Sequence, residues 1–157
     1  MSTMSSARSR GFTLTEMLVV IGIIVMFIGV SLFIDMNNFR GNAFRGERAI
    51  LVTLLQTARA DSLNNIDQEP HGIALFPSDH PNSYVLFEGS NYAASDPSLR
   101  EPTDAQYPVT FTPASPSEVV FSQLSGNANY DGDIVMNDTE RGLSATISIN
   151  REGRISW

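Results

Sequence analysis

The feature that most constrains this chain is an apolar run near its amino terminus that contains a single charged residue. Residues 12–34 are apolar or small apart from three hydroxyl side chains and Glu16. As an α-helix with a rise of about 1.5 Å per residue, the run extends roughly 34 Å, which matches the ~30 Å hydrocarbon core of a bilayer. An ionised carboxylate in such a helix costs at least ~2.5 kcal/mol and is usually retained for a partner. The sequence therefore predicts a transmembrane helix over 12–34 in which Glu16 has a function.

A short polar segment, residues 1–11, precedes this run and carries no acid. It ends at Gly11, directly before Phe12. A secretory signal peptide would place small residues in an A-x-A arrangement after its apolar run, whereas this run leads into Asp-Met-Asn-Asn-Phe-Arg. Cleavage before the run, between Gly11 and Phe12, fits the sequence better. Such cleavage would leave a free ammonium group on Phe12, and this group and Glu16 of a neighbouring subunit would neutralise each other in a helical bundle.

The residues from this junction onward, Gly-Phe-Thr-Leu-Thr-Glu-Met-Leu-Val-Val-Ile, resemble the class III signal of type IV prepilins. In that family a prepilin peptidase cuts after the glycine that matches Gly11. The new amino terminus, which matches Phe12, is then methylated, and the acid that matches Glu16 serves assembly. A plain single-span anchor with Glu16 at the level of the lipid headgroups is the alternative, but such an anchor needs neither the acid nor the Gly-Phe junction.

The resemblance also implies a location and a set of partners. We expect a single-pass protein of the bacterial inner (cytoplasmic) membrane with an extracytoplasmic head, which later enters a pilus or pseudopilus. The implied partners are prepilin peptidase, other pilin or pseudopilin subunits, the inner-membrane assembly platform and membrane lipid.

Length, charge and cysteine content limit the part of the chain beyond the apolar run. The chain has 157 residues, so one globular domain remains after the leader and the span. Its net charge of −7 opposes binding to nucleic acid on average. There is no cysteine, so the head holds together without disulfides and has no cysteine metal site. Many major pilins close a C-terminal loop with a disulfide, and this chain departs from them.

The segment 35–65 is predicted to be a stem followed by an amphipathic helix. Asn and Gly residues over 35–46 weaken a helix, so the stem is expected to bend or melt there. Apolar side chains then recur at helical spacing and predict a helix over 43–65. These apolar positions are Ile50, Leu51, Leu54, Leu55 and Ala58.

Beyond residue 65 the chain has the pattern of an antiparallel β-sheet. Short β-branched and aromatic runs alternate with Pro, Gly, Asn and Asp, which predicts a β head domain over 66–157. Residues 89–107 are predicted to be a long surface loop. The candidate strands are 71–76, 83–88, 108–112, 118–123, 133–136, 143–150 and 153–157.

The predicted fold class is therefore α+β. A long N-terminal helix, transmembrane in its first half and amphipathic in its second, packs on an antiparallel sheet as in pilins. Within the prepilin group, several short runs resemble the GspH/FimT-type minor pseudopilins, including Ala-Arg-Ala-Asp-Ser at 58–62. The other matching runs lie at 71–75, 119–121, 147–150 and 153–155.

The head shows no pattern typical of an enzyme. His71 and His80 lack visible convergent partners for catalysis or zinc binding, and no phosphate-binding loop or nucleophile elbow is present. We therefore expect a non-enzymatic protein without a cofactor.

Oxygen donors gather near the C-terminus, where some pseudopilins bind calcium. Asp131, Asp133 and Asp138 are the candidate ligands, but the spacing lacks the glutamate that closes an EF-hand loop. Asp-Gly is also a strong turn signal, so we interpret this segment as a turn and predict no metal.

Three arginines form the basic cluster of an acidic head: Arg141, Arg151 and Arg154. FimT-like minor pilins bind DNA through C-terminal arginines, so the resemblance makes these residues candidate DNA contacts. The competing interpretation is a solvated strand edge that uses charge to block edge-to-edge pairing. The sequence thus favours a structural minor subunit of a type IV pilus or type II secretion pseudopilus. The alternatives are a DNA-binding minor pilin of a competence system and a membrane-tethered binding module that never polymerises.

Overall fold

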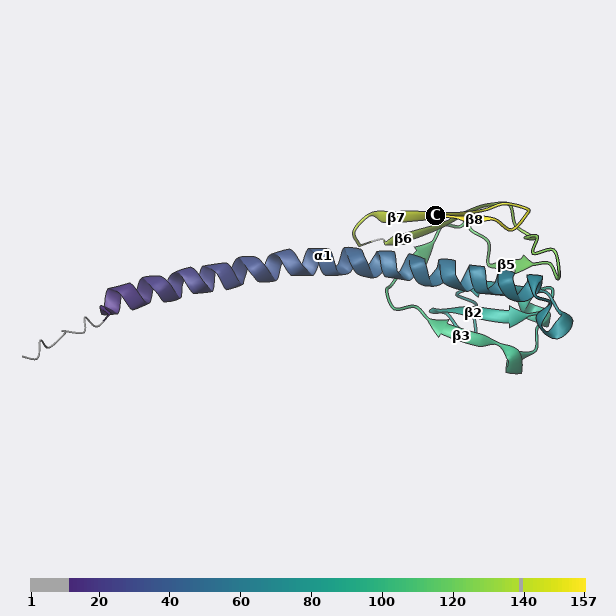
Figure 1. Cartoon of the computed structure of the whole chain (residues 1–157), viewed down its shortest axis with the longest axis horizontal. Helices are drawn as coiled ribbons and strands as arrows, with labels where there is room; N and C mark the ends of the chain where they lie inside the picture. The colour runs from purple at the N-terminus through teal and green to yellow at the C-terminus, as the bar shows by residue number, and fades with distance from the viewer. Residues whose placement is uncertain (1–11, 139) are drawn as a thin grey trace, which may run out of the picture. The chain divides into compact units, whose positions relative to one another are not determined.

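The computed structural model describes residues 12–138 and 140–157, and of residues 31–40 it describes only the backbone. The predicted leader, residues 1–11, and with it Gly11 of the cleavage site lie outside the described residues. The chain divides into two compact units, Met1–Arg40 and Gly41–Trp157. The first described helix, α1 (Leu14–Leu63), contributes to both units (Figure 1).

Helix α1 is continuous where the sequence predicts a weak stem. The backbone is helical throughout 35–46, so the predicted melting of this segment is wrong, whereas the predicted bend stays a prediction. Asn and Gly each cost at most about 1 kcal/mol in a helix interior. Because the residues on both sides are already helical, the chain does not have to nucleate a new helix in this segment. The helix ends at Leu63, two residues before the predicted end.

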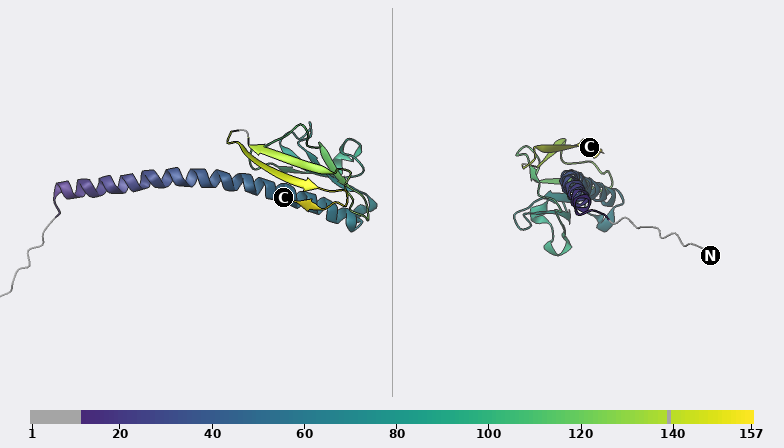
Figure 2. Two further views of the ribbon diagram at one scale, coloured as in Figure 1. Left: turned by 90° about the horizontal axis from the view of Figure 1, so that it is seen from above. Right: turned by 90° about the vertical axis from the view of Figure 1, so that its left-hand side faces the viewer.

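Among the described residues after α1, two antiparallel sheets of four strands are present. Figure 2 shows these strands beside the helix. The first sheet has the order β3-β2-β1-β5, and the second has the order β4-β6-β7-β8. The first sheet contains β1 (His71–Leu75), β2 (Ser83–Glu88), β3 (Glu101–Asp104) and β5 (Glu118–Phe121). The second contains β4 (Thr110–Phe111), β6 (Gly132–Asp138), β7 (Leu143–Ile149) and β8 (Ile155–Ser156). The α+β fold, with a long helix on antiparallel strands, is confirmed.

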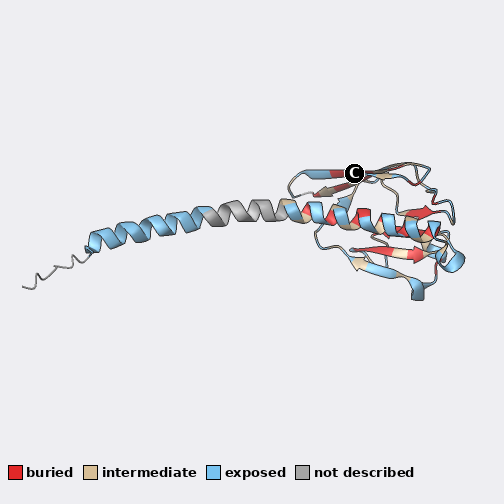
Figure 3. Cartoon of the chain, viewed as in Figure 1, coloured by how far each residue is buried: buried red, intermediate tan, exposed pale blue. Residues whose placement is uncertain are grey.

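Both sheets pack against the second half of α1. Of the apolar stripe predicted on this helix, Leu51, Leu55 and Ala58 are fully covered and Ile50 and Leu54 are half-buried. Buried positions recur along this part of the helix (Figure 3). Their neighbours in the same core come from both sheets: Ile73, Tyr84, Val119 and Phe121 from the first, and Ile134, Ile147 and Ile149 from the second. Complete burial of one such aliphatic side chain contributes about 1.5–3 kcal/mol, so this stripe is the main attachment of α1 to the sheets.

A buried carboxylate lies beside this stripe. Glu47 on α1 is 1% exposed, and its Oε2 atom accepts hydrogen bonds from the backbone N–H groups of Gln106 (2.9 Å) and Tyr107 (3.0 Å). Burial raises the pKa of the nearby Tyr84 hydroxyl, and the negative charge of Glu47 raises it further. Glu47 therefore joins α1 to the segment between β3 and β4.

The predicted loop over 89–107 is instead an ordered segment that contains a strand. It contains the short 3₁₀ helices η2 (Tyr92–Ala94) and η3 (Pro97–Leu99), followed by β3, so the prediction of a plain surface loop is wrong. Pro102 lies in β3, which is the edge of its sheet, and a proline that lacks an N–H is tolerated at an edge.

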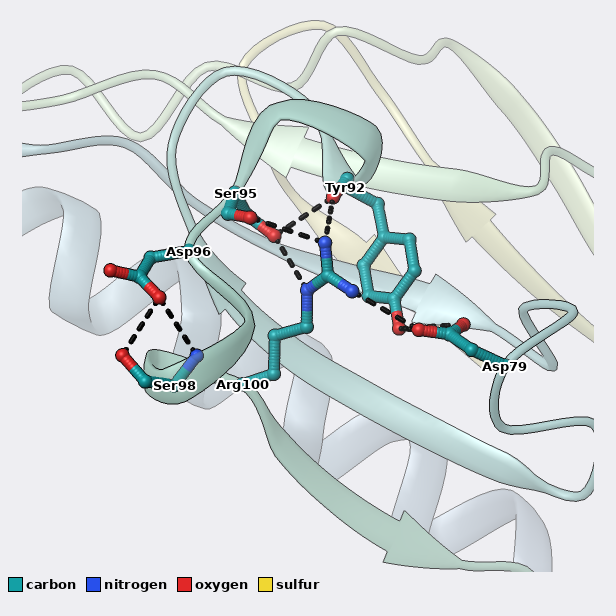
Figure 4. A network of polar contacts seen from close by, with 6 residues as sticks. All are labelled: Asp79, Tyr92, Ser95, Asp96, Ser98 and Arg100. Carbon is teal, nitrogen blue, oxygen red and sulfur yellow. Dashed lines mark hydrogen bonds and ion pairs between the residues drawn. The ribbon is translucent and has the colours of Figure 1, made fainter.

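Arg100 holds this segment together (Figure 4). Its guanidinium group donates to the carbonyl oxygen of Tyr92 (2.8 Å), to the hydroxyl of Ser95 (2.9 Å) and to the carboxylate of Asp79 (3.1 Å). The same group lies 4.1 Å from the centre of the Tyr92 ring. The Tyr92 hydroxyl also donates to Asp79, and this bond is the main reason that the pKa of Asp79 is lowered. One arginine thus cross-links the two 3₁₀ helices to the loop after β1.

Candidate functional site

The start of α1 has the geometry of a capped helix. Thr13 immediately precedes the first helical residue, and the N–H of Glu16 donates to its carbonyl oxygen (3.1 Å) and its hydroxyl (3.3 Å). The spacing Thr-x-x-Glu is that of a capping box. Glu16 therefore lies in the first helical turn, where the partial positive charge of the helix terminus favours a carboxylate. Glu16 is also exposed, so it is available to a partner.

The start of α1, up to residue 30, is uncovered, and beyond its first turn it carries only apolar residues and glycine. Every residue over 12–30 is exposed, with Phe12 at 75% and Leu14 at 81%. A helix that is apolar all round normally lies within a core, a bundle or a membrane. Among the described residues, however, no helix combines the length and the apolar character needed to cross a bilayer. The transmembrane segment predicted over 12–34 stays a prediction.

The three candidate DNA-contacting arginines do not form one patch. Arg151 is paired with Asp131 at 3.4 Å, and Arg154 lines a shallow cavity together with Asp131 and Asp133. Arg141 precedes β7, whereas the other two follow it. Because seven residues of β-strand extend about 20 Å, Arg141 lies far from the other two. The structure thus brings Arg151 and Arg154 together among acids and leaves Arg141 apart.

The candidate calcium ligands each have another partner. Asp138 is buried and accepts hydrogen bonds from the Tyr107 hydroxyl (2.6 Å) and the N–H of Glu140 (2.9 Å). The bond from Tyr107 is the main cause of the lowered pKa of Asp138. Asp133 accepts a hydrogen bond from Ser148, and Asp131 forms its ion pair with an arginine. Within 12–138 and 140–157 these three carboxylates do not converge on one point.

A different group of metal-binding side chains converges where α1 turns into the first sheet. Asp67, His71 and Glu88 place one potential ligand atom each within 4.8 Å of the other two. His80, the second candidate histidine, is not part of this group. The sequence shows His71 but not its partners, because Glu88 approaches it only through the pairing of β1 with β2.

Comparison with known proteins concerns the amino-terminal segment. No curated protein and no solved structure matches the chain. Residues 6–32 match the model of the prokaryotic N-terminal methylation motif. The matched range includes Gly11, Phe12 and Glu16. The chain therefore carries a prepilin-type methylation motif at its amino terminus, as type IV pilin-like and pseudopilin subunits do.

Proposed function

We propose that this chain is a minor structural subunit of a type IV pilus or of a type II secretion pseudopilus. Prepilin peptidase cuts it between Gly11 and Phe12, Phe12 is methylated, and the first half of α1 drives assembly. One observation carries this proposal: the methylation motif over 6–32 contains the start of α1, which is exposed up to residue 30 and apolar on all sides over 17–30.

The exposed helix needs two environments in succession. Before assembly, lipid of the inner membrane covers it while the head, residues 66–157, lies on the extracytoplasmic side. The assembly platform then transfers the subunit to a bundle of like helices. Because lipid tails are as apolar as the helix, packing between side chains and pairing of polar groups drive this transfer.

Glu16 supplies the polar pairing. Cleavage creates an ammonium group on Phe12, four residues before Glu16. Within one subunit Glu16 belongs to the first helical turn, and its exposed carboxylate is free to pair with the ammonium group of a neighbour. Burying an unpaired charge between helices is costly, whereas a paired ammonium and carboxylate offset that cost, so the pairing sets the axial register of neighbouring subunits.

The test separates processing from assembly. The full chain and its variants are expressed with a prepilin peptidase and the partner subunits, and mass spectrometry reads the amino terminus. We expect Gly11→Val to retain residues 1–11, and Glu16→Ala to be cut and methylated but absent from sheared filaments. Glu16→Gln keeps the size of the side chain and loses its charge, so it should fail in assembly as well. Thr15→Ala, one residue away on the same exposed helix, is the matched control and should assemble.

Two results would contradict this division of roles. An uncut Glu16→Ala chain would place Glu16 in recognition by the peptidase. If Glu16→Gln enters filaments normally, charge pairing does not set the axial register of neighbouring subunits.

A further inference from the structure

We infer that Asp67, His71 and Glu88 bind one divalent transition-metal cation of the zinc class, at the end of the head where α1 turns into β1. This site goes beyond the proposed assembly function, because none of its three residues lies in the segment that is processed or that drives assembly.

The fold brings the three side chains together from three segments of the chain. His71 and Glu88 are direct partners in the antiparallel pairing of β1 with β2, so their side chains project from the same face of the sheet. Asp67 comes from the short helix η1 (Ile66–Gln68), which connects α1 to β1. An imidazole nitrogen and one oxygen of each carboxylate lie within 4.8 Å of one another.

His71 gives an independent indication of a ligand. The residue is 3% exposed, and its Nδ1 atom is buried without a hydrogen-bond partner among the described residues. Its backbone is fixed, because its N–H donates to the hydroxyl of Ser62 (2.9 Å). A buried polar atom without a partner is unfavourable, because it has lost its hydrogen bonds to water. A metal ion bound to one ring nitrogen would give this buried side chain a partner. It would also change the hydrogen bonds that both ring nitrogens require.

The two carboxylates also favour a cation. One carboxylate oxygen of Asp67 and one of Glu88 lie within 4.8 Å of each other and of an imidazole nitrogen. Two like charges at short range beside a buried ring are unfavourable unless a proton or a cation lies between them. A divalent ion would neutralise both carboxylates at once.

The donor set identifies the class of ion. One imidazole nitrogen and two carboxylate oxygens suit Zn²⁺ and neighbouring first-row metals, whereas Ca²⁺ and Mg²⁺ prefer six or more oxygen ligands. Ligands about 2.0–2.2 Å from zinc in a tetrahedron are roughly 3.5 Å apart, so the side chains must close in slightly. Asp67 is exposed and Glu88 is half-buried, which leaves both free to make this movement. Three protein ligands leave a fourth position for water or for a group from another molecule.

Calorimetric titration of the untagged full chain in detergent micelles, after removal of metal with a chelator, tests the site with ZnCl₂. We expect one equivalent of Zn²⁺ to bind to the unaltered protein. Asp67→Asn and Glu88→Gln should each lower the affinity at least about tenfold, since each removes one charged ligand. Asn tolerates the left-handed backbone of Asp67 (φ 52°), so that variant should fold normally. Glu69→Gln is the matched control, because this exposed acid lies in the same segment outside the group of three.

A second readout concerns His71 itself. In ¹⁵N spectra of the histidine side chains, Zn²⁺ should shift a His71 ring nitrogen and leave His80 unchanged. The inference is overturned if no stoichiometric binding occurs or if Asp67→Asn and Glu88→Gln bind as the unaltered protein does. It is also overturned if Glu69→Gln weakens binding equally. The first two outcomes would mean that a proton shared by the two carboxylates accounts for the cluster, and the third would mean that Zn²⁺ binds through the general negative charge of this segment. Because assembly into filaments is not measured, failure of this site leaves the proposed function intact.

Discussion

Replacing Glu47 should weaken the attachment of α1 to the head more than replacing any other polar residue on that helix. The carboxylate is 1% exposed and accepts two backbone hydrogen bonds, from Gln106 and Tyr107. Hydrogen bonds to a charged group contribute ~1.5–3 kcal/mol each, and burying the carboxylate offsets part of this gain. Glu47→Ala removes the acceptor and leaves two N–H groups unpaired, so we expect the free energy of unfolding to fall by about 3 kcal/mol. Glu47→Gln keeps a neutral acceptor and should cost about 1 kcal/mol.

Two measurements on the full chain in micelles test this prediction. Urea denaturation followed by near-ultraviolet circular dichroism gives the free energy of unfolding. Hydrogen exchange read by mass spectrometry follows the amides of Gln106 and Tyr107, which should lose protection in Glu47→Ala. Asp61→Asn makes the same change of charge on the same helix at a half-buried position and serves as the control. The reasoning is refuted if Glu47→Ala is as stable as Asp61→Asn while both amides stay protected.

Three further predictions concern the rest of the head. Gly153 has a φ of +72°, and a Cβ atom there would overlap the carbonyl oxygen of Gly126, so Gly153→Ala should lower stability by about 2–3 kcal/mol in thermal unfolding. Gly142→Ala is the matched control, because Gly142 has a similar φ of +66° and a Cβ there meets no atom within 4 Å. It should cost less, and equal losses would contradict the overlap. Arg100→Lys keeps the charge but loses the planar guanidinium group and its contact with the Tyr92 ring. The local stability of 90–100 should therefore fall by about 1–2 kcal/mol, which hydrogen exchange measures. Unchanged exchange would contradict the cross-linking role of Arg100. Because burial raises the pKa of Tyr84, the unfolded chain loses that proton first as the pH rises, so stability should fall above about pH 10. Tyr84→Phe should reduce that slope in urea titrations at several pH values, and an unchanged slope would exclude Tyr84 as its source.

The sequence predicts the parts of the fold that depend on local pattern. The apolar stripe at Leu51, Leu55 and Ala58 follows from helical periodicity, and these residues form the core. Strand β2 has its predicted range, because its β-branched and aromatic residues are bounded by turn-forming residues, Asn82 before it and Gly89 after it. By contrast, β3 contains Pro102 and charged residues, so only its pairing with β2 makes it a strand.

The candidate sites depend more on tertiary structure. The methylation motif is a continuous stretch of sequence and needs no fold to be recognised. The partners of His71 are set by strand register and by the backbone turn at Asp67, neither of which has a local signal. The separation of Arg141 from Arg151 follows from the length of β7, although the two residues are close in sequence.

The hydrogen bonds of the Ser62 hydroxyl affect how the head would respond to a force that pulls on α1. Near the C-terminal end of α1, Ser62 donates to the carbonyl oxygen of Phe121 (2.9 Å) and accepts from the N–H of His71 (2.9 Å), while Glu47 holds the same helix about 22 Å away. A pulling force along α1 would therefore load the hydrogen bonds of Ser62, those of Glu47 and the apolar stripe between them in shear. All of these contacts would have to break at the same time. Such an attachment resists pulling far better than one that opens bond by bond, which would suit the proposed role of α1 in filament assembly.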